Sequence, residues 1–217
     1  MHIDFKKEKD QILRNLEDIE ESLNGLDPFS IDSFDREDTL IVFIDVINGF
    51  ISEGVYSNPL AGGIMDCVKE LADNKKCIPS IAFADYHSSD SLEFEAHPEH
   101  ALAGTSESEL HESIAGKVRD VFHKDSINGF FAAGFKEFFD KNIAVKNIIV
   151  AGLVTDICVL NFCLTLKSYC NQTGRKLDIH VPMAGVESFD LKDVHSATLM
   201  NLVSASMMLT NSIKLYN

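Results

Sequence analysis

Short apolar runs alternate with amphipathic segments along most of this chain. Six runs rich in apolar and β-branched residues predict strands at 39–44, 78–84, 118–122, 147–150, 177–181 and 206–209. Between most of them, apolar residues recur every three to four positions, which predicts helices at 62–74, 135–141, 156–170 and 191–202. This alternation predicts an α/β fold, a three-layer Rossmann-like sandwich with helices on both faces of a mostly parallel sheet of about six strands.

A charged helical segment precedes this pattern. Residues 5–23 have helical periodicity, and the helix is expected to end near Asn24 and Gly25, with Pro28 following. We therefore expect residues 1–38 to form a helical extension, packed on the core or against a partner subunit. Residues 39–217 are expected to form a single domain.

Polar side chains follow several of the predicted strands directly. They are Asp45, Asp85 with His87, Lys124 and Cys158. Because open parallel sheets bind ligands at the carboxyl ends of their strands, these residues are expected to converge on one rim. A carboxylate, an ammonium, a thiol and a candidate metal cluster would then meet there from distant parts of the chain.

Cys158 is the candidate nucleophile. An apolar run ends at Gly152 and an amphipathic pattern begins about four residues later, so the thiol is expected in the first helical turn, where the helix dipole favours thiolate. Asp45 can accept the thiol proton, and Lys124 can stabilise the thiolate and keep Asp45 ionised. The simpler alternatives are a small buried Cys158, a turn-forming Asp45 and a solvated Lys124.

Residues 85–100 are dense in side chains that bind metal ions. In an extended strand end, Asp85 and His87 point to the same side. A further histidine and a carboxylate from the following loop could complete a site for zinc, manganese or iron with positions left open for water and ligand. The competing ligands are His97 and His100, and Glu93, Glu95 and Glu99. The simpler alternative is a polar surface loop with scattered histidines.

Composition limits the location and the partners of the protein. Its 217 residues are 45% hydrophobic and 24% charged, which suits one soluble domain. The formal net charge of -15 disfavours nucleic acid as a partner. There is no apolar stretch long enough to span a bilayer and no secretory signal, so we expect a cytoplasmic protein without a membrane partner. Five cysteines without Cys-x-x-Cys spacing argue against a disulfide framework.

Three segments of the chain contain the acid, the amine and the thiol in this order. They span residues 43–50, 123–130 and 152–159. Together they resemble the three conserved blocks of isochorismatase-like cysteine hydrolases, and within that family they are most similar to those of nicotinamidases. The resemblance implies that residues 39–217 form the hydrolase domain. It also implies a triad of Asp45 as base, Lys124 as its charged partner and Cys158 as nucleophile.

The same resemblance implies a metal site. The Asp85-Tyr-His87 segment matches the metal motif of nicotinamidases, and His100 matches a later histidine before a Gly-Thr pair, which favours it over His97. Glu93 is the better match for the fourth ligand. The implied cofactor is a divalent metal ion, Zn²⁺ first and Mn²⁺ or Fe²⁺ as alternatives.

The resemblance also implies an oxyanion site and an aromatic wall. A cis peptide bond is expected at Val154-Thr155, in the turn that directs backbone N–H groups, including that of Cys158, at the substrate oxygen. The chain has no Trp, which nicotinamidases often place against the ring. Phe50 matches a ring-contacting aromatic residue, and Phe130 or Phe131 is expected to supply another wall, although core packing is an equal alternative for this pair.

The implied reaction is hydrolysis of nicotinamide to nicotinate and ammonia through a cysteine thioester, with the metal orienting the pyridine ring. This reaction belongs to NAD metabolism. One alternative is a related cysteine hydrolase acting on another small amide, such as a carbamoyl or ureido compound. Another is a non-catalytic binding module on the same fold. The expected partner is a small-molecule amide, and homo-oligomer formation stays open.

Overall fold

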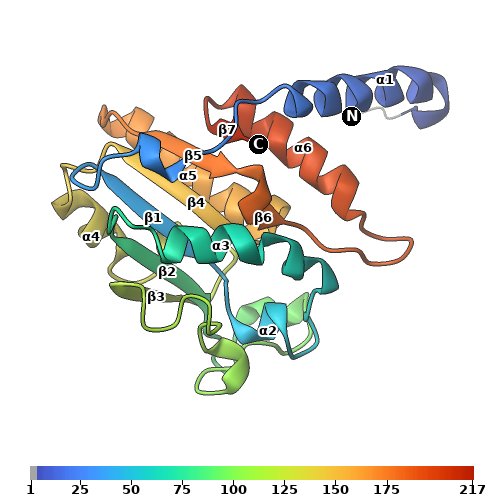
Figure 1. The fold of residues 1–217 in the computed structure, drawn as a ribbon. Helices are drawn as coiled ribbons and strands as arrows, with labels where there is room; N and C mark the ends of the chain where they lie inside the picture. Colours follow the sequence, from blue (N-terminus) through green and yellow to red (C-terminus); the bar gives the residue numbers. More distant parts are fainter. Residues whose placement is uncertain (1–3) are drawn as a thin grey trace.

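The computed structural model describes residues 4–217, so the first three residues of the predicted N-terminal extension lie outside the described residues. Strands and helices alternate along the rest of the chain (Figure 1). The strands are β1 (Thr39–Ile44), β2 (Ser80–Asp85), β3 (Asp120–Lys124), β4 (Asn147–Leu153), β5 (Asp178–Pro182), β6 (Val186–Glu187) and β7 (Lys214–Tyr216). The helices are α1 (Phe5–Asn24), α2 (Asn48–Ile51), α3 (Met65–Ala72), α4 (Phe135–Lys141), α5 (Leu160–Thr173) and α6 (Ala197–Thr210).

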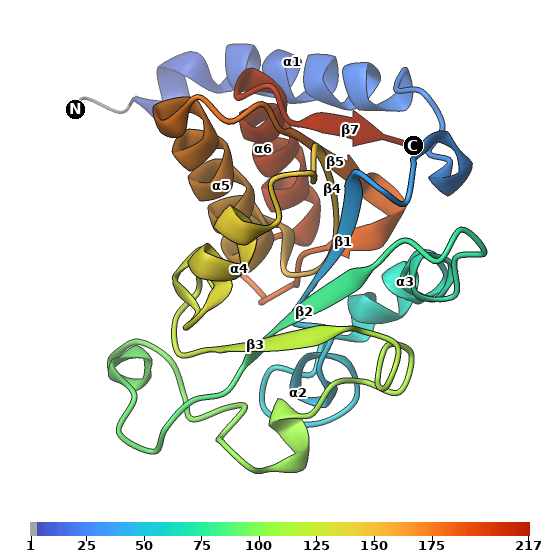
Figure 2. The same cartoon turned by 90° about the vertical axis from the view of Figure 1, so that its left-hand side faces the viewer.

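The strands form one parallel sheet. Its order is β3-β2-β1-β4-β5-β7, and the short β6 pairs with the end of β4. Each of the described pairings is parallel, with β1 between β2 and β4. Helices lie on both sides of the sheet (Figure 2). The predicted three-layer α/β sandwich is therefore confirmed.

The strand sequences explain why both faces of the sheet are covered. In β1, Leu40, Val42 and Ile44 join the core cluster that includes residues of α4, α5 and α6. The alternating residues Ile41 and Phe43 join the second cluster, which includes α3. All six residues of β1 are buried. A central parallel strand therefore reads as a continuous apolar run instead of an alternating one.

Two sequence predictions near the C-terminus are wrong. Residues 206–209 do not form a strand, because they lie inside α6 (Ala197–Thr210), and the last strand is β7 (Lys214–Tyr216). The helix predicted at 191–202 begins instead at Ala197, where the Ser196 side chain accepts a hydrogen bond from the Leu199 N–H at 3.4 Å and caps the helix. A short apolar run cannot by itself distinguish a strand from part of a helix.

Helix α1 lies at the edge of the molecule, beside α6 and β7 (Figures 1 and 2). Its N-terminus is capped by Asp4, whose side chain accepts a hydrogen bond from the Lys7 N–H at 3.2 Å, and the helix ends at Gly25 as predicted. No residue of α1 is buried. Among residues 4–217, no helix combines the length and the apolar character needed to cross a bilayer.

Candidate active site

Cys158 lies where the chain leaves the central strand β4 and turns into α5. The turn, Thr155–Val159, is a single π-helical turn, so the thiol precedes the regular helix instead of lying within its first turn. The Val154 carbonyl accepts hydrogen bonds from the N–H groups of Ile157 and Val159 at 3.3 and 3.2 Å. These bonds hold the turn against the strand end, and only 6% of Cys158 is exposed.

The acid and the amine that the sequence singled out are close to this sulfur. Lys124 at the end of β3 places its Nζ atom 2.8 Å from Oδ2 of Asp45 and 3.7 Å from Sγ of Cys158. It also pairs with Asp85. Ligand atoms of Asp45, Asp85 and Cys158 lie within 4.8 Å of one another. Residues from β1, β2, β3 and the turn after β4 thus meet at the carboxyl edge of the sheet.

Burial controls the protonation of this cluster. Burial, together with the Asp85 carboxylate, raises the pKa of Asp45 to about 7, although Lys124 opposes this change. Burial also raises the pKa of the Cys158 thiol well above its usual value, and the positive charge of Lys124 does not compensate. From the sequence, a thiolate favoured by the helix dipole was expected. Burial instead favours the protonated thiol, so attack by sulfur requires a base.

Lys124 is the charged centre of the cluster. Burial alone would lower the pKa of its ammonium group, but the carboxylates of Asp45 and Asp85 outweigh burial and raise that pKa well above the usual value. Lys124 therefore stays positive between two buried acids. An unpaired carboxylate in this position would be costly to bury.

The predicted metal ligands also come together. The Nε2 atom of His87 lies 3.5 Å from Oε2 of Glu93 and 3.6 Å from Oδ1 of Asp85. The Nε2 atom of His100 lies 4.0 Å from Oδ2 of Asp85. Asp85 therefore contacts both the ligand cluster and Lys124, which joins the two halves of the site.

The opposite nitrogen of each histidine has a partner that fixes its tautomer. Nδ1 of His87 donates a hydrogen bond to Oδ1 of Asp125 at 2.7 Å, and Nδ1 of His100 donates one to the Pro98 carbonyl at 2.9 Å. Both Nε2 atoms therefore face Asp85, where they could bind a cation as in protein metal sites where a histidine is held by its other nitrogen. Nε2 of His87 and Oε2 of Glu93 are buried without a hydrogen-bond partner. This arrangement fits a metal ion.

His97 lies beside this cluster, with its ring centroid 6.5 Å from that of His100, but its Nδ1 atom has another partner. Nδ1 of His97 pairs with the Tyr56 hydroxyl at 2.9 Å. Glu95 and Glu99 are exposed to solvent. Of the competing residues, the structure brings His100 and Glu93 next to Asp85 and His87.

A cavity of about 450 Å³ connects the sulfur to the ligand cluster. Cys158, Asp85, Glu93 and His100 border it. Its remaining walls are largely apolar or aromatic, and they include Phe50, Val55, Tyr56, Ile127, Val154, Ile157, Phe189 and Leu191. This volume and lining suit a small aromatic molecule with a few polar groups.

The aromatic wall differs in part from the sequence prediction. Phe50 borders the cavity as expected. Phe130 does not, because it is buried in the core, with ring centroids 5.2 Å from Tyr169 and 6.0 Å from Phe135. Phe131 is 71% exposed. Ile127, three residues before Phe130, supplies the wall instead.

The cis peptide bond is also displaced from its predicted position. It joins Leu153 to Val154, one residue before the expected Val154-Thr155 bond. Val154 borders the cavity, whereas the side chain of Thr155 is buried. The N–H groups of Val154, Thr155 and Cys158 remain the candidate donors to a substrate oxygen.

The segment that contains Phe189 and Leu191 was not predicted from the sequence to border the site. The structure ties this segment to the nucleophile turn through Asp156. Oδ1 of Asp156 accepts a hydrogen bond from the Ser188 hydroxyl at 2.5 Å, and its Oδ2 lies 2.9 Å from Nε2 of His195. The His195 ring stacks on Phe189 with centroids 3.9 Å apart. An Asp two residues before the cysteine was the available signal, but its partner is 39 residues away.

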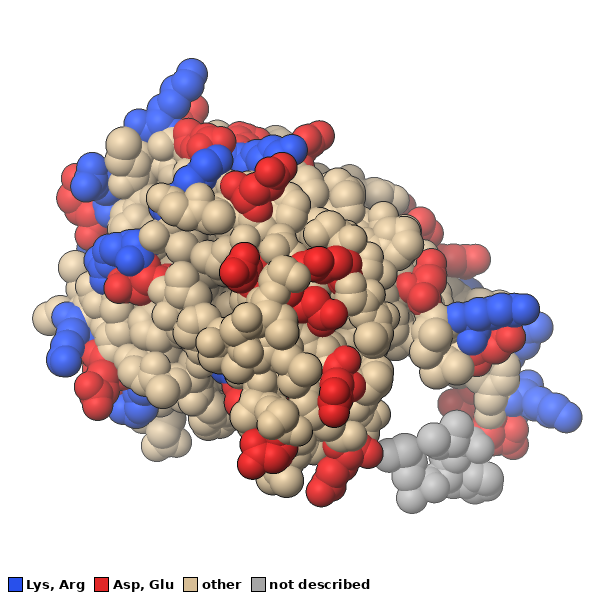
Figure 3. Space-filling model, turned by 90° about the horizontal axis from the view of Figure 1, so that it is seen from below, with Lys and Arg blue, Asp and Glu red and all other residues tan. Residues whose placement is uncertain are grey.

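Acidic side chains dominate the centre of the face seen in Figure 3, while basic ones lie mostly at its edges. This agrees with the net charge of -15. Anions are therefore repelled from this part of the surface.

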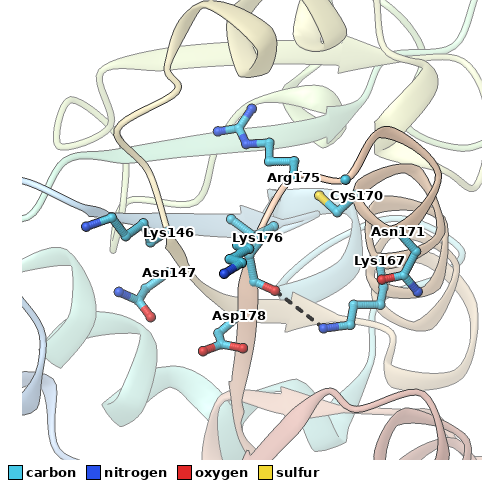
Figure 4. Close-up of a pocket in the computed structure, with 10 residues that line it drawn as sticks. Lys146, Asn147, Lys167, Cys170, Asn171, Arg175, Lys176 and Asp178 are labelled. Atoms are coloured by element: carbon cyan, nitrogen blue, oxygen red, sulfur yellow. Dashed lines mark hydrogen bonds between the residues drawn. The ribbon is translucent and has the colours of Figure 1, made fainter.

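A second hollow, of about 640 Å³, lies at the opposite edge of the sheet and holds none of the predicted site residues (Figure 4). Two of its cations have backbone partners. Arg175 donates to the carbonyls of Phe139 and Asn142, each at 2.7 Å, and Lys167 donates to that of Leu177 at 3.4 Å. We assign these contacts to the packing of α4 and α5.

A parallel α/β sandwich with a buried acid, amine and thiol at its carboxyl edge is the arrangement expected of a hydrolase with a cysteine nucleophile. Comparison with known families is consistent with this class. Residues 39–212 match the isochorismatase domain, and the chain belongs to the isochorismatase-like hydrolase family.

Individual proteins similar to this chain include a nicotinamidase, a pyrazinamidase and an amidase. Nicotinamidase 1 of Arabidopsis thaliana is 32% identical over 184 residues, which cover 72% of this chain and 74% of the relative. A pyrazinamidase of Pyrococcus horikoshii, solved in complex with zinc, is similar in fold, with a TM-score of 0.67 and 16% identity over 83% of this chain and 99% of that one. An N-carbamoylsarcosine amidase of Thermoplasma acidophilum has a TM-score of 0.65 and 20% identity over 83% of this chain and 96% of its own.

Proposed function

We propose that this protein hydrolyses nicotinamide to nicotinate and ammonia. The observation that carries the proposal is the shared cavity, in which Cys158 and the ligand cluster of Asp85 and His100 face one space of about 450 Å³. An aromatic amide with a ring nitrogen has two polar groups, the amide and the ring nitrogen. In this cavity the amide could lie at Cys158 and the ring nitrogen at the ligand cluster. The relative named Nicotinamidase 1 supports this choice of substrate.

Asp85, His87, Glu93 and His100 would hold a divalent metal ion, with zinc as the first choice and manganese or iron as alternatives. Two imidazoles and two carboxylates suit each of these ions. A bound ion would coordinate the pyridine nitrogen and fix the orientation of the ring. The zinc in the Pyrococcus horikoshii structure supports the first choice.

In the first half of the reaction, Asp45 accepts the proton of the Cys158 thiol. The sulfur then attacks the carboxamide carbon, and the N–H groups of Val154, Thr155 and Cys158 are the donors to the oxygen that becomes negative. Removal of one such donor raises the barrier of comparable enzymes by about 3–4 kcal/mol. Asp45 then returns the proton to the leaving nitrogen, the C–N bond breaks, and ammonia departs from the thioester.

In the second half, Asp45 accepts a proton from water, and the resulting hydroxide attacks the thioester carbon. The C–S bond breaks, the sulfur recovers a proton from Asp45, and nicotinate leaves. Lys124 remains positive throughout and stabilises the thiolate, whose sulfur lies 3.7 Å from its Nζ atom. Phe50 packs against the ring in both halves.

The test is ammonia release by metal-quantified protein from nicotinamide, pyrazinamide and a carbamoyl amide. We expect turnover of both aromatic amides and little of the carbamoyl compound. Preferred turnover of the carbamoyl compound would assign the site to the alternative amide class. A binding module would release no ammonia from any of the three, and its Cys158 would react with thiol reagents as slowly as the buried Cys163 does.

A further inference from the structure

Helix α6 carries no charged side chain over its 14 residues, although 24% of the whole chain is charged. Three of its apolar residues, spaced four apart, stay in contact with solvent: Leu199 is 43%, Val203 36% and Met207 41% exposed. Residues at this spacing share one face of a helix. An exposed apolar stripe without charges resembles the centre of a protein interface, where charged residues are depleted and Met is enriched.

Helix α1 packs beside α6 but is not buried by it. It has 20 residues, and none of them is buried. Its apolar stripe of Ile12, Leu16, Ile19 and Leu23 is only half-covered, and the neighbouring Leu13 is 47% exposed. In proteins, most of the stability of a helix comes from packing of its apolar face, and here that face is only partly packed. The molecule therefore presents an incompletely covered helix next to an uncharged apolar stripe.

Two pairs of charged residues in α1 lie at equal sequence distances on either side of Leu13. In each pair, the residue before Leu13 is basic and the residue after it is acidic. Lys9 and Glu17 lie four residues on either side of it, and Lys6 and Glu20 lie seven residues on either side. These spacings place all five residues on one face of the helix. Across residues 4–217, none of the four charged side chains takes part in an ion pair. An antiparallel copy of the same face, centred on Leu13, would bring each Lys opposite a Glu.

We propose that two copies of this chain associate through α1 and the stripe of Leu199, Val203 and Met207 on α6. The α1 helices pair antiparallel about a twofold axis at Leu13, so Lys9 meets Glu17 of the other copy and Lys6 meets Glu20. Such an interface is self-complementary, as twofold symmetry requires. This inference does not depend on the reaction that the cavity supports.

Both parts of the surface are needed for a stable dimer. A helix of 20 residues is about 30 Å long, so two paired helices alone cover less than the roughly 800 Å² per partner of a typical stable interface. The apolar stripe of α6, next to α1, extends the contact. Each copy has a net charge of -15, and the uncharged helix is a place where two copies can meet without opposing like charges.

The test is sedimentation of the full chain at micromolar concentration. We expect the wild-type protein to sediment with twice its mass of 24.1 kDa. The double variant Glu17→Lys/Glu20→Lys makes the α1 face wholly basic, and Lys6→Glu/Lys9→Glu makes it wholly acidic. Each variant alone should sediment as a monomer. The control Asp66→Lys/Glu70→Lys, which makes the same change of charge on the exposed face of α3, should remain a dimer.

An equimolar mixture of the two α1 variants decides the orientation. Because a basic face then meets an acidic one, the mixture should recover the dimer, and this recovery also shows that both variants are folded. Met207→Glu in the α6 stripe should give a monomer that the mixture with wild type does not rescue. The proposal would be overturned if the wild-type protein were a monomer, or if either α1 double variant alone were a dimer. It would also be overturned if the mixture of the two variants stayed monomeric.

Discussion

At the scale of single residues, Lys124 determines the electrostatics of the site. Lys124 is 2% exposed, its ammonium group pairs with Asp45 and Asp85, and its Nζ atom lies 3.7 Å from the sulfur of Cys158. Two carboxylates, one thiol and one amine thus share a single buried volume. The positive charge of Lys124 therefore stabilises both Asp45, the candidate base, and Asp85, a candidate metal ligand.

Replacement of Lys124 by Met should therefore affect both stability and activity. Two buried carboxylates lose their counter-charge, so we expect a loss of about 3–5 kcal/mol in unfolding free energy. Ammonia release should fall by at least about a hundredfold, because the thiolate loses its stabilising charge. Urea unfolding and steady-state assays measure the two effects.

The matched control is Lys117→Met. Lys117 pairs with Asp73 at 2.8 Å, but both side chains are solvent-exposed in part, so its loss should cost less than about 1 kcal/mol. Equal losses for the two variants would show that burial does not set the strength of the Lys124 pairs.

His180 makes stability depend on pH away from the site. Burial lowers the pKa of His180 to about 4, and its ring lies between the Tyr216 hydroxyl and Oδ1 of Asn147. Since the pKa is lower in the folded chain than in the unfolded one, the contribution of this neutral histidine is complete above the usual value of about 6.5. It decreases as the pH falls from there to about 4, by at most about 3 kcal/mol.

The variant His180→Gln isolates this effect, because Gln does not titrate. It should be less stable than wild type at pH 7, and the difference should shrink by pH 4. Urea midpoints at the two values measure it. A constant difference between the two proteins would show that His180 does not titrate in this range.

At the scale of elements, the contact between β1 and β4 positions the acid and the thiol. Gly152 pairs with Ile44 in the sheet and has a φ angle of +134°. A Cβ atom on Gly152 would lie 1.9 Å from the carbonyl oxygen of Ile44, the residue before Asp45. The close approach of these strands therefore requires glycine at this position.

Gly152→Ala should consequently destabilise the protein by more than about 3 kcal/mol, since neither backbone can yield without breaking the sheet. Gly62→Ala is the control, because its Cβ would meet no atom within 4 Å. Thermal unfolding of both variants measures the difference. A Gly152→Ala protein as stable as the control would contradict the strand geometry described here.

The sequence predicted elements well where periodicity and burial agree. Runs such as 39–44 are apolar because both faces of a central strand are covered, and α4 lies at the predicted residues 135–141. The prediction at 206–209 failed because α6 has no charged side chain to mark its exposed face. The prediction that Phe130 borders the cavity was wrong because a phenylalanine in the core and one in a cavity wall look the same in the sequence.

At the scale of the whole molecule, the fold brings two chemically different sites together through Asp85. Asp45, Lys124 and Cys158 come from the ends of β1 and β3 and the turn after β4, whereas the candidate metal ligands come from the end of β2 and the loop after it. Because these strands pair in parallel, their carboxyl ends lie along the same edge of the sheet. The sequence therefore predicted which polar residues meet, while Phe189 and Leu191 depend on long-range contacts that no local pattern records.

Removal of the metal should weaken substrate binding even when the nucleophile is absent. In the variant Cys158→Ala, which keeps the ligand cluster, chelation should weaken nicotinamide binding by at least about tenfold, equivalent to about 1.4 kcal/mol. Calorimetric titration before chelation, after it and after return of zinc measures this loss and its recovery. Unchanged binding after complete removal of metal would show that the cluster does not orient the ring.

The proposed reaction requires a covalent bond between the Cys158 sulfur and the acyl group of the substrate. Its most direct test is rapid acid quenching of the enzyme during turnover of nicotinamide, followed by mass spectrometry of the intact chain and its peptides. We expect a nicotinoyl group on the peptide that contains Cys158, and neither the adduct nor ammonia from Cys158→Ala. Turnover by that variant, or an adduct on another residue, would contradict this account.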